Sequence, residues 1–387
     1  MNTSSKIKVL TVFGTRPEAI KMAPLVKALE ADTRFDSIVC VTAQHRQMLD
    51  QVLDLFSIIP DFDLNVMHAK QSLADITTRV LNGLCEVMED VQPQITLVHG
   101  DTTTTFAAGL AAYYNKIPVG HVEAGLRTNN IYFPFPEEMN RKLTGAIASM
   151  HFSPTESNRA NLLREGVSDE NIYITGNTVI DVLKSTVQPD YQFSVDALNQ
   201  IDYQNHRILA VEVHRRENLG APMEDICNAL LKITDSYPDT LLVYPVHMNP
   251  QVREPVFRIL SNHNRIHLLD PIGLEDMHNL IARSFLVLSD SGGLQEESPS
   301  LGTPMLVLRN ETERPEAVNA GTVKLAGTVY ADIISAASLL CDDSEAYNKM
   351  RNAINPYGDG NASSRIVQAI ASKFLPGIPR PKPFSVQ

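Results

Sequence analysis

The sequence lacks a long apolar run, closely spaced cysteines and an excess of positive charge. No apolar stretch approaches the ~20 residues of a membrane-spanning helix, so we expect none. The net charge of −12 excludes a general basic surface for nucleic acid or anionic lipid. An anionic ligand must therefore be bound by local Arg, Lys and backbone N–H groups. The four cysteines are too far apart for a zinc or redox motif, which favours reduced thiols in a cytoplasmic protein. The N-terminus also lacks the apolar region of a signal peptide.

What is present is typical of a globular chain with two domains. The 387 residues are too many for one ordinary hydrophobic core, and apolar residues make up 43% of them. The first half alternates strand and helix patterns. The expected strands and helices here are Ile7–Phe13, Pro17–Glu30, Ser37–Val41, Leu73–Met88, Ile95–Val98, Thr105–Tyr114 and Val119–Val122. This alternation predicts a parallel sheet with right-handed crossovers.

The polar segment 186–205 interrupts the alternation, and we interpret it as the interdomain connection. The pattern then restarts. The second half is expected to contain Ile208–Val213, Met223–Ser236, Leu241–Val246, Ile266–Leu269, Leu274–Arg283, Phe285–Leu288, Met305–Leu308 and a last helix near Ser363–Phe374. The sequence therefore predicts an α/β protein with two Rossmann-like, doubly wound domains, 1–185 and 186–362. We expect them to face a central cleft lined by the ends of their strands.

Two acidic residues stand where predicted buried strands end. Asp101 follows the strand at 95–98, and Glu123 follows the strand at 119–122. Ligands of open parallel sheets bind at this edge, and two carboxylates there can serve as proton donor and acceptor. Glu137 is a third candidate, although an acid after Pro136 is also an ordinary helix N-terminal charge.

Two further segments suit a phosphorylated ligand. Gly14 and Arg16 form the turn from the first strand to the first helix, where a helix N-terminus favours an anion, and Lys21 lies one turn later. Ser291-Gly292-Gly293 follows another buried strand, so its backbone N–H groups can approach a diphosphate, and Glu297 could accept hydrogen bonds from ribose.

Two basic segments have an alternative structural interpretation. Arg314 could close over phosphates or pair with a neighbouring Glu. His214, followed by Arg215 and Arg216 at a strand edge, suits phosphate recognition, or it could be a buried structural histidine.

Taken together, these segments resemble the nonhydrolysing UDP-N-acetylglucosamine 2-epimerases over nearly the whole chain. The motifs that carry the resemblance are Phe13–Glu18, Gln44–Gln51, His99–Thr102, Val122–Arg127, Pro136–Glu138, His214–Asn218, Asp290–Gly293 and Thr312–Glu316. The resemblance implies a GT-B-like fold in which the C-terminal helix, about 363–387, packs back on the first domain. It also implies interconversion of UDP-GlcNAc and UDP-ManNAc, supplying ManNAc for cell-surface polysaccharide, in a homodimer without a cofactor or a metal ion.

The resemblance also implies residue roles. The positions that match catalytic residues of the family are Asp101, Glu123, Glu137 and His214. Those that match nucleotide-sugar contacts are Arg16, Lys21, Ile272, Met277, Ser291, Gly292, Gly293, Glu297 and Arg314.

A second, activating site for UDP-GlcNAc is implied by the Gln-His-Arg-Gln form of the second loop. The residues assigned to it are Gln44, His45, Gln47, Lys70, Arg215 and His247. Lys70 stands where the resemblance leads us to expect Arg, and Lys lacks the bidentate guanidinium. Glu212, just before the histidine motif, is unusual, and we expect it to point away from the site.

The chemistry of the sugar limits the mechanism. The hydrogen at C2 is not next to a carbonyl, so its direct removal would leave an unstabilised carbanion. Neither the Gly-rich nicotinamide fingerprint nor a Tyr-x-x-x-Lys is present for an oxidation route. Elimination of UDP to 2-acetamidoglucal, followed by re-addition, is the workable path, and the resemblance implies the same one. The alternatives are a hydrolysing 2-epimerase that releases ManNAc and UDP, a GT-B glycosyltransferase, and a catalytically idle nucleotide-sugar sensor.

Overall fold

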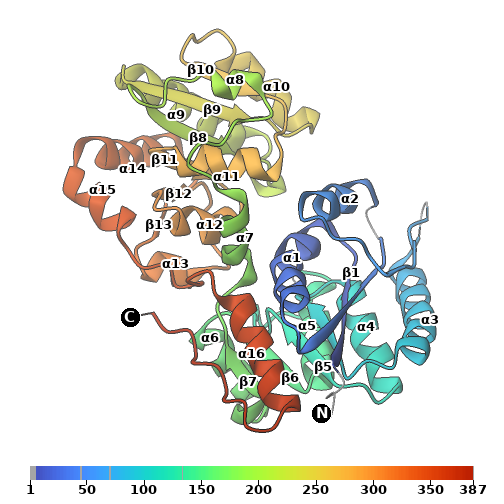
Figure 1. The fold of residues 1–387 in the computed structure, drawn as a ribbon. Coiled ribbons are helices and arrows are strands. Elements are labelled where there is room, and N and C mark those ends of the chain that lie inside the picture. The colour runs from blue at the N-terminus through green and yellow to red at the C-terminus, as the bar shows by residue number, and fades with distance from the viewer. Residues whose placement is uncertain (1–5, 44–45, 69–70, 133, 387) are drawn as a thin grey trace. The chain divides into compact units, whose positions relative to one another are not determined.

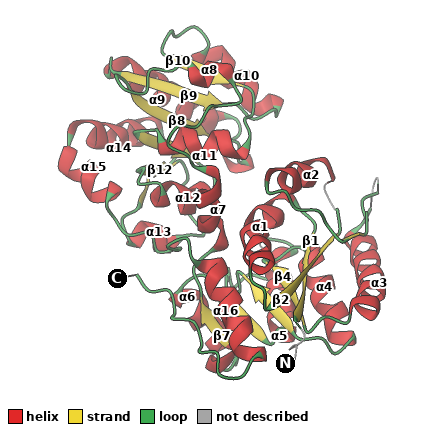
Figure 2. Cartoon of the chain, viewed as in Figure 1, coloured by secondary structure: helices red, strands yellow, loops and turns green. Residues whose placement is uncertain are grey.

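The computed structural model describes residues 6–43, 46–68, 71–132 and 134–386, and it divides the chain into two compact α/β units (Figure 1). Unit 1 comprises Met1–Val182 and Tyr357–Ser385, and unit 2 comprises Leu183–Pro356 with the last two residues. In both units the strands are flanked by helices (Figure 2). The prediction of two Rossmann-like α/β domains is confirmed.

Unit 1 is built on a seven-stranded parallel sheet in the order β3-β2-β1-β4-β5-β6-β7. Its strands are β1 Ile7–Phe13, β2 Phe35–Val41, β3 Phe62–Asp63, β4 Ile95–His99, β5 Val119–Val122, β6 Met150–Ser153 and β7 Ile172–Ile174. Its helices are α1 Arg16–Ala31, α2 Arg46–Leu55, α3 Leu73–Val91, α4 Thr103–Tyr114, α5 Glu137–Ile147, α6 Glu156–Arg164 and α16 Ala362–Phe374, with a 3₁₀ turn at Asp169–Asn171.

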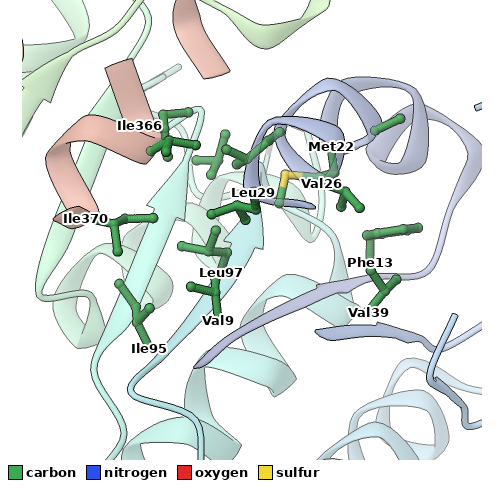
Figure 3. Close-up of a cluster of buried hydrophobic side chains, with 14 of the residues drawn as sticks. Val9, Phe13, Met22, Val26, Leu29, Val39, Ile95, Leu97, Ile366 and Ile370 are labelled. Carbon is green, nitrogen blue, oxygen red and sulfur yellow. The ribbon is translucent and has the colours of Figure 1, made fainter. Parts of the chain in front are cut away.

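The C-terminal helix α16 completes the core of unit 1. Figure 3 shows its Ile366 and Ile370 among buried side chains that include Leu29 of α1 and Ile95 of β4. The carboxylate of Asp181 accepts hydrogen bonds from the first two backbone N–H groups of α16, at 3.0 and 2.7 Å. The burial of these side chains and the Asp181 cap explain why α16, almost 200 residues after the last strand of the first sheet, folds onto that sheet.

Unit 2 repeats the architecture with six parallel strands in the order β10-β9-β8-β11-β12-β13. Its strands are β8 Arg207–Glu212, β9 Thr240–Pro245, β10 Ile266–Leu269, β11 Leu286–Ser289, β12 Met305–Val307 and β13 Val323–Leu325. Its helices are α8 Asp196–Asn199, α9 Ala221–Ser236, α10 Pro250–Leu260, α11 Leu274–Ala282, α12 Leu294–Ser300, α13 Pro315–Asn319, α14 Tyr330–Asp342 and α15 Ser344–Arg351, with a 3₁₀ turn at Arg216–Asn218.

The polar segment 186–205 is a folded part of unit 2. Phe193 and Leu198 are buried, and Asp276 of α11 accepts hydrogen bonds from the Tyr191 hydroxyl and the Ser194 backbone at 3.0 and 2.9 Å. The boundary between the units falls within helix α7, Thr178–Thr186. Our interpretation of 186–205 as a connecting segment is therefore corrected: its few apolar side chains are enough to anchor it.

None of the helices in the described ranges is both long and apolar enough to cross a bilayer.

Candidate functional site

The strand order places the candidate residues at the switch point of each sheet. In unit 1 the order reverses between β1 and β4, and in unit 2 between β8 and β11. Loops that follow neighbouring strands on either side of such a point diverge and leave a crevice for a ligand. Arg16 begins the helix that follows β1, and Asp101 lies in the loop after β4. The loops after β8 and β11 contain His214 and Ser291. Both sheets thus direct the predicted residues to the edge where parallel α/β folds bind ligands.

Glu123 is held in a strained backbone conformation directly after β5. Its φ of 62° lies in the left-handed region, which non-glycine residues seldom adopt outside functional or tightly constrained positions. Its Oε2 accepts hydrogen bonds from the Lys21 ammonium and, at 2.9 Å, from the Asn177 amide, and it lies 3.7 Å from Nε2 of His99. Burial alone would raise the pKa of Glu123, but Lys21, His99 and these hydrogen bonds outweigh it and hold the pKa well below its usual range. The Glu123 carboxylate is therefore ionised at neutral pH.

His99, beside Glu123, is a neutral imidazole. Burial lowers its pKa to about 4, against the opposing influence of the Glu123 charge. It is consequently uncharged at neutral pH, which leaves Lys21 as the fixed positive charge on Glu123.

Asp101 lies in the opposite electrostatic situation. Burial raises its pKa, the Arg141 guanidinium that it pairs with opposes this, and the negative charges of Glu123 and Glu137 reinforce it. The net result is a raised pKa. The two predicted acids thus have pKa values displaced in opposite directions, which is the pattern expected of a proton donor and a proton acceptor.

Glu137 and Glu138 open helix α5 and have different surroundings. Glu137 is half-buried and close enough for its charge to act on Asp101. Glu138 is fully buried, accepts hydrogen bonds from the backbone N–H groups of Thr128 and Asn129, both at 3.1 Å, and pairs with Arg141 at 3.2 Å. Glu138 therefore orders the loop, and the charge of Glu137 acts on Asp101.

A buried carboxylate joins the β1 and β4 loops. Glu18 accepts from the backbone of Thr15 at 2.8 Å through one oxygen, and from the hydroxyls of Thr102 and Thr105 at 2.6 and 3.1 Å through the other. It closes the N-terminal capping box of α1 while holding the loop next to Asp101.

In unit 2, His214 lies between two carboxylates. Its Nδ1 is 2.7 Å from Glu212 Oε1 and 3.9 Å from Asp290 Oδ1. The hydrogen bond to Glu212 raises the pKa of His214, burial opposes this, and the charges of Glu212 and Asp290 add to it, while Arg215 acts against it. The expectation that Glu212 points away is wrong. Side chains two residues apart along an extended chain project to the same face, so Glu212 and His214 point together.

The Ser291–Gly293 turn is packed against Arg314. A Cβ added to Gly292 would lie 2.6 Å from the Arg314 guanidinium, so only glycine allows this approach. Arg314 also donates to Glu296 at 2.6 Å and to Glu313 at 2.8 Å, so it pairs with neighbouring acids. Glu297, one turn into α12, lies 3.3 Å from Nε2 of the buried His278.

The remaining predicted binding residues occupy loops and helix ends. Arg16 is exposed at the start of α1. Ile272 precedes α11 and Met277 lies within it, and both are half-buried.

Of the residues assigned to a second site, two lie beside His214. His247 stacks on the His214 ring at a centroid distance of 5.2 Å, and Arg215 is adjacent in sequence and lies 3.4 Å from Glu313. The others cannot be placed: Gln44, His45 and Lys70 lie outside the described residues, as does the side chain of Gln47, whose backbone is in α2.

The cluster of Glu212, His214 and Asp290 has ligand atoms within 4.8 Å of one another, a spacing that could hold a metal ion. Asp290, however, already accepts from the backbone of Arg215 at 2.9 Å and from the Asn218 amide at 2.8 Å. Both of its oxygens thus accept from N–H donors, Oδ1 from the backbone of His214 at 3.2 Å, and Glu212 and His214 lie at ion-pair distance from each other, 2.7 Å. This geometry favours a shared-proton network over a cation site.

The sequence analysis did not identify several residues of the site. Asn177, which contacts Glu123, belongs to no motif that we singled out. Arg141, which pairs with Asp101, ends the segment 135–141 that carries Glu137, and Glu18 ends another motif, but neither was given a role. For Glu18 a signal exists: Thr15 and Glu18 have the spacing of a capping box. Asn177 and Arg141 are 54 and 40 residues away from the acids that they contact. No local spacing reveals such pairs.

The family model described as UDP-N-acetylglucosamine 2-epimerase matches residues 27–371. The Bacillus subtilis UDP-N-acetylglucosamine 2-epimerase is 55% identical over 365 residues, 94% of this chain and 95% of that protein. The structure of the Neisseria meningitidis UDP-GlcNAc 2-epimerase bound to UDP-GlcNAc is 49% identical, with a TM-score of 0.82 over 94% of this chain and 99% of that one. The S. aureus MnaA–UDP co-structure is 48% identical, with a TM-score of 0.88 over 98% and 100% of the two chains.

Proposed function

This chain belongs to the UDP-N-acetylglucosamine 2-epimerase family, and we propose that it interconverts UDP-GlcNAc and UDP-ManNAc without releasing free sugar. One observation carries the proposal: Glu123 and Asp101, after neighbouring strands, have pKa values displaced in opposite directions. Inverting a carbon that bears hydrogen requires a base to remove that hydrogen and an acid to return one, and this pair supplies both.

The reaction proceeds by elimination and re-addition. A base takes the proton from C2 while the C1–O bond breaks, so the electrons of the C2–H bond form the C1=C2 double bond of 2-acetamidoglucal. The electrons of the C1–O bond leave with UDP. UDP then returns to C1, and a proton is delivered to the opposite face of C2. No oxidant or reductant is consumed.

Unit 1 carries the proton transfers. Glu123 is the proton acceptor because Lys21 and Asn177 keep it ionised. Asp101 is assigned as the donor, because burial and the charges of Glu123 and Glu137 raise its pKa and so favour its protonated form. Glu137 acts on the pair as the third acid, since its charge contributes to the raised pKa of Asp101.

Unit 2 binds the uridine diphosphate. The loop at Ser291–Gly293 and the guanidinium of Arg314, which packs on it, are assigned to the diphosphate, and Glu297 to the ribose. Arg16 and His214 stabilise the charge of the departing diphosphate. Ile272 and Met277 are assigned to the uracil ring.

The test is the product mixture formed from UDP-GlcNAc, followed by ¹H and ³¹P NMR. We expect UDP-ManNAc to accumulate until a constant ratio of the two nucleotide sugars is reached, with no net release of UDP. Release of UDP with free ManNAc would show a hydrolysing enzyme. A requirement for a sugar acceptor would show a glycosyltransferase, and binding without turnover would show a sensor.

Three finer assignments belong to the same proposal. UDP-GlcNAc also activates the enzyme at a second site containing Gln44, His45, Gln47, Lys70, Arg215 and His247; of these, His247 and Arg215 lie next to His214. The enzyme is a cytoplasmic homodimer. Its product supplies ManNAc for cell-surface polysaccharide.

A further inference from the structure

The side chain of Glu212 is unexplained by the roles assigned above, although it makes the closest polar contact of His214. Glu212 is the last residue of β8, and its side chain is 22% exposed. Its Oε1 lies 2.7 Å from His214 Nδ1, and its Oε2 accepts a hydrogen bond from the Ser289 hydroxyl at 3.0 Å. Both oxygens therefore have a partner, and the carboxylate is fixed between the ends of β8 and β11.

The backbone of His214 is fixed from the other side. Asp290 accepts hydrogen bonds from the backbone N–H groups of His214, at 3.1 Å, and Arg215, at 2.9 Å. Tyr244 donates to the carbonyl of Val213 at 2.8 Å. Backbone and ring are therefore held by separate groups, and Glu212 is the carboxylate within ion-pair distance of the ring, with its Oε1 2.7 Å from Nδ1.

We propose that Glu212 is a positioning residue that holds His214 as a doubly protonated imidazolium, with Nδ1–H on Glu212 and Nε2–H presented to the diphosphate. The proposal rests on the function assigned above. An ionised carboxylate can only accept hydrogen bonds, so the His214 nitrogen that faces it must carry a proton. With Nδ1 protonated, Nε2 carries a proton only in the cation, so donation from Nε2 to a phosphate oxygen requires the imidazolium.

The consequence for the reaction is electrostatic. As the C1–O bond breaks, its electron pair moves onto UDP, and the imidazolium donates a stronger hydrogen bond to the diphosphate. The proton stays on His214, and the interaction weakens again when UDP returns to C1. Glu212 thus acts through His214 and need not touch the substrate.

Among the residues that the structure describes, the charged or titratable groups that act on His214 or stack on it come from several elements. Glu212 of β8 and Asp290 after β11 stabilise the cation, while Arg215 disfavours it. His247, after β9, stacks on the ring, and its Nδ1 accepts from the backbone N–H of Asn249 at 3.1 Å. Glu212 makes the shortest contact with the ring, 2.7 Å from Nδ1, so its charge is the one to remove.

The test compares wild-type protein with Glu212→Gln, which keeps the size and an acceptor oxygen but loses the charge. The matched control is Glu224→Gln, a charge loss on α9, where Glu224 pairs with Arg258 and is 53% exposed. ¹⁵N-histidine NMR of the full chain, without any sugar nucleotide, follows the titration of His214, which is assigned from the signal missing in His214→Asn. We expect the His214 midpoint to move to lower pH in Glu212→Gln and to stay unchanged in the control.

The kinetic readout is kcat/KM against pH. The high-pH limb should move to lower pH in Glu212→Gln, with a loss of about tenfold near pH 8.5 and a change below about twofold near pH 6, as expected for one hydrogen bond to a charged group. A merely structural role would lower activity equally at all pH values. If Glu212→Gln does not fold, Glu212→Thr is titrated instead.

An unchanged His214 midpoint in the folded variant would overturn the proposal. The titration needs no substrate, so it decides the role of Glu212 even if the wild-type enzyme fails to epimerise UDP-GlcNAc. That failure would contradict the proposed function separately.

Discussion

Replacing Lys21 by Met tests whether this lysine is what keeps Glu123 ionised. The side chains of Lys21 and Glu123 are only 17% and 11% exposed, so Lys21→Met leaves a nearly buried carboxylate without its cation. Removing one partner of a buried ion pair typically costs 3–5 kcal/mol of stability. Because Asn177 still donates to Glu123 in the variant, we expect the lower end, about 3 kcal/mol near pH 8.

The pH dependence of this cost has a defined sign. In the wild-type protein the pKa of Glu123 is depressed, so the pair stabilises the fold above the pKa of an unfolded glutamate, and this contribution is lost as pH falls through the folded pKa. Burial is the largest single influence on Glu123, and without Lys21 it is no longer outweighed, so the pKa of Glu123 rises. The ionised carboxylate is then penalised most at high pH, and the penalty shrinks as acidification protonates it.

The assay is urea unfolding followed by circular dichroism at several pH values. Lys27→Met is the matched control, since Lys27 pairs with Glu30 on the surface, where both side chains are about 40% exposed, and should cost less than about 1 kcal/mol. The double variant with Glu123→Gln should recover much of the loss. The reasoning is refuted if Lys21→Met costs no more than the control, or if its cost does not diminish at low pH.

Three further predictions follow from single contacts. Asp101→Asn should lower kcat by about 10²–10⁴-fold while UDP binding, measured by calorimetry, stays intact; near-normal kcat would remove Asp101 from the proton transfers. Gly292→Ala places a Cβ 2.6 Å from the Arg314 guanidinium and should weaken UDP binding by about tenfold, which an unchanged Kd would contradict. Gly125→Ala should destabilise unit 1 by at least about 2 kcal/mol in urea unfolding, since φ is 92° and the added Cβ meets the Asn158 carbonyl oxygen at 2.3 Å; wild-type stability would show that the loop relaxes.

The strands and helices with strong local patterns were predictable from sequence. Buried parallel strands are continuous apolar runs, so β1, β5 and β10 have the predicted bounds. The two-residue strand β3 has no such run and escaped prediction. The boundary between the units, at Val182 and Leu183 within α7, lies three residues before the expected division at 185/186.

In the candidate site, too, some features were predictable from the sequence and others were not. Asp101 and Glu123 were predictable because an acid at the end of a buried strand has a local signature. Their electrostatic difference was not, because it depends on Lys21, Asn177 and Arg141, which come from elements distant in sequence.

The orientation of Glu212 could have been inferred. It lies two positions before His214, and along an extended chain residues with that spacing share a face. We expected Glu212 to point away because a glutamate is unusual at this position. The two-residue alternation of side chains along an extended chain predicts the opposite orientation.

The most direct measurement of the central claim is the isotope content of C2 after incubation with UDP-GlcNAc in D₂O. Reversible proton removal by Glu123 and Asp101 predicts deuterium at C2 of both recovered nucleotide sugars, seen by ¹H NMR and mass spectrometry, with Glu123→Gln greatly slowing its appearance. Formation of UDP-ManNAc that retains the original hydrogen at C2 would contradict it.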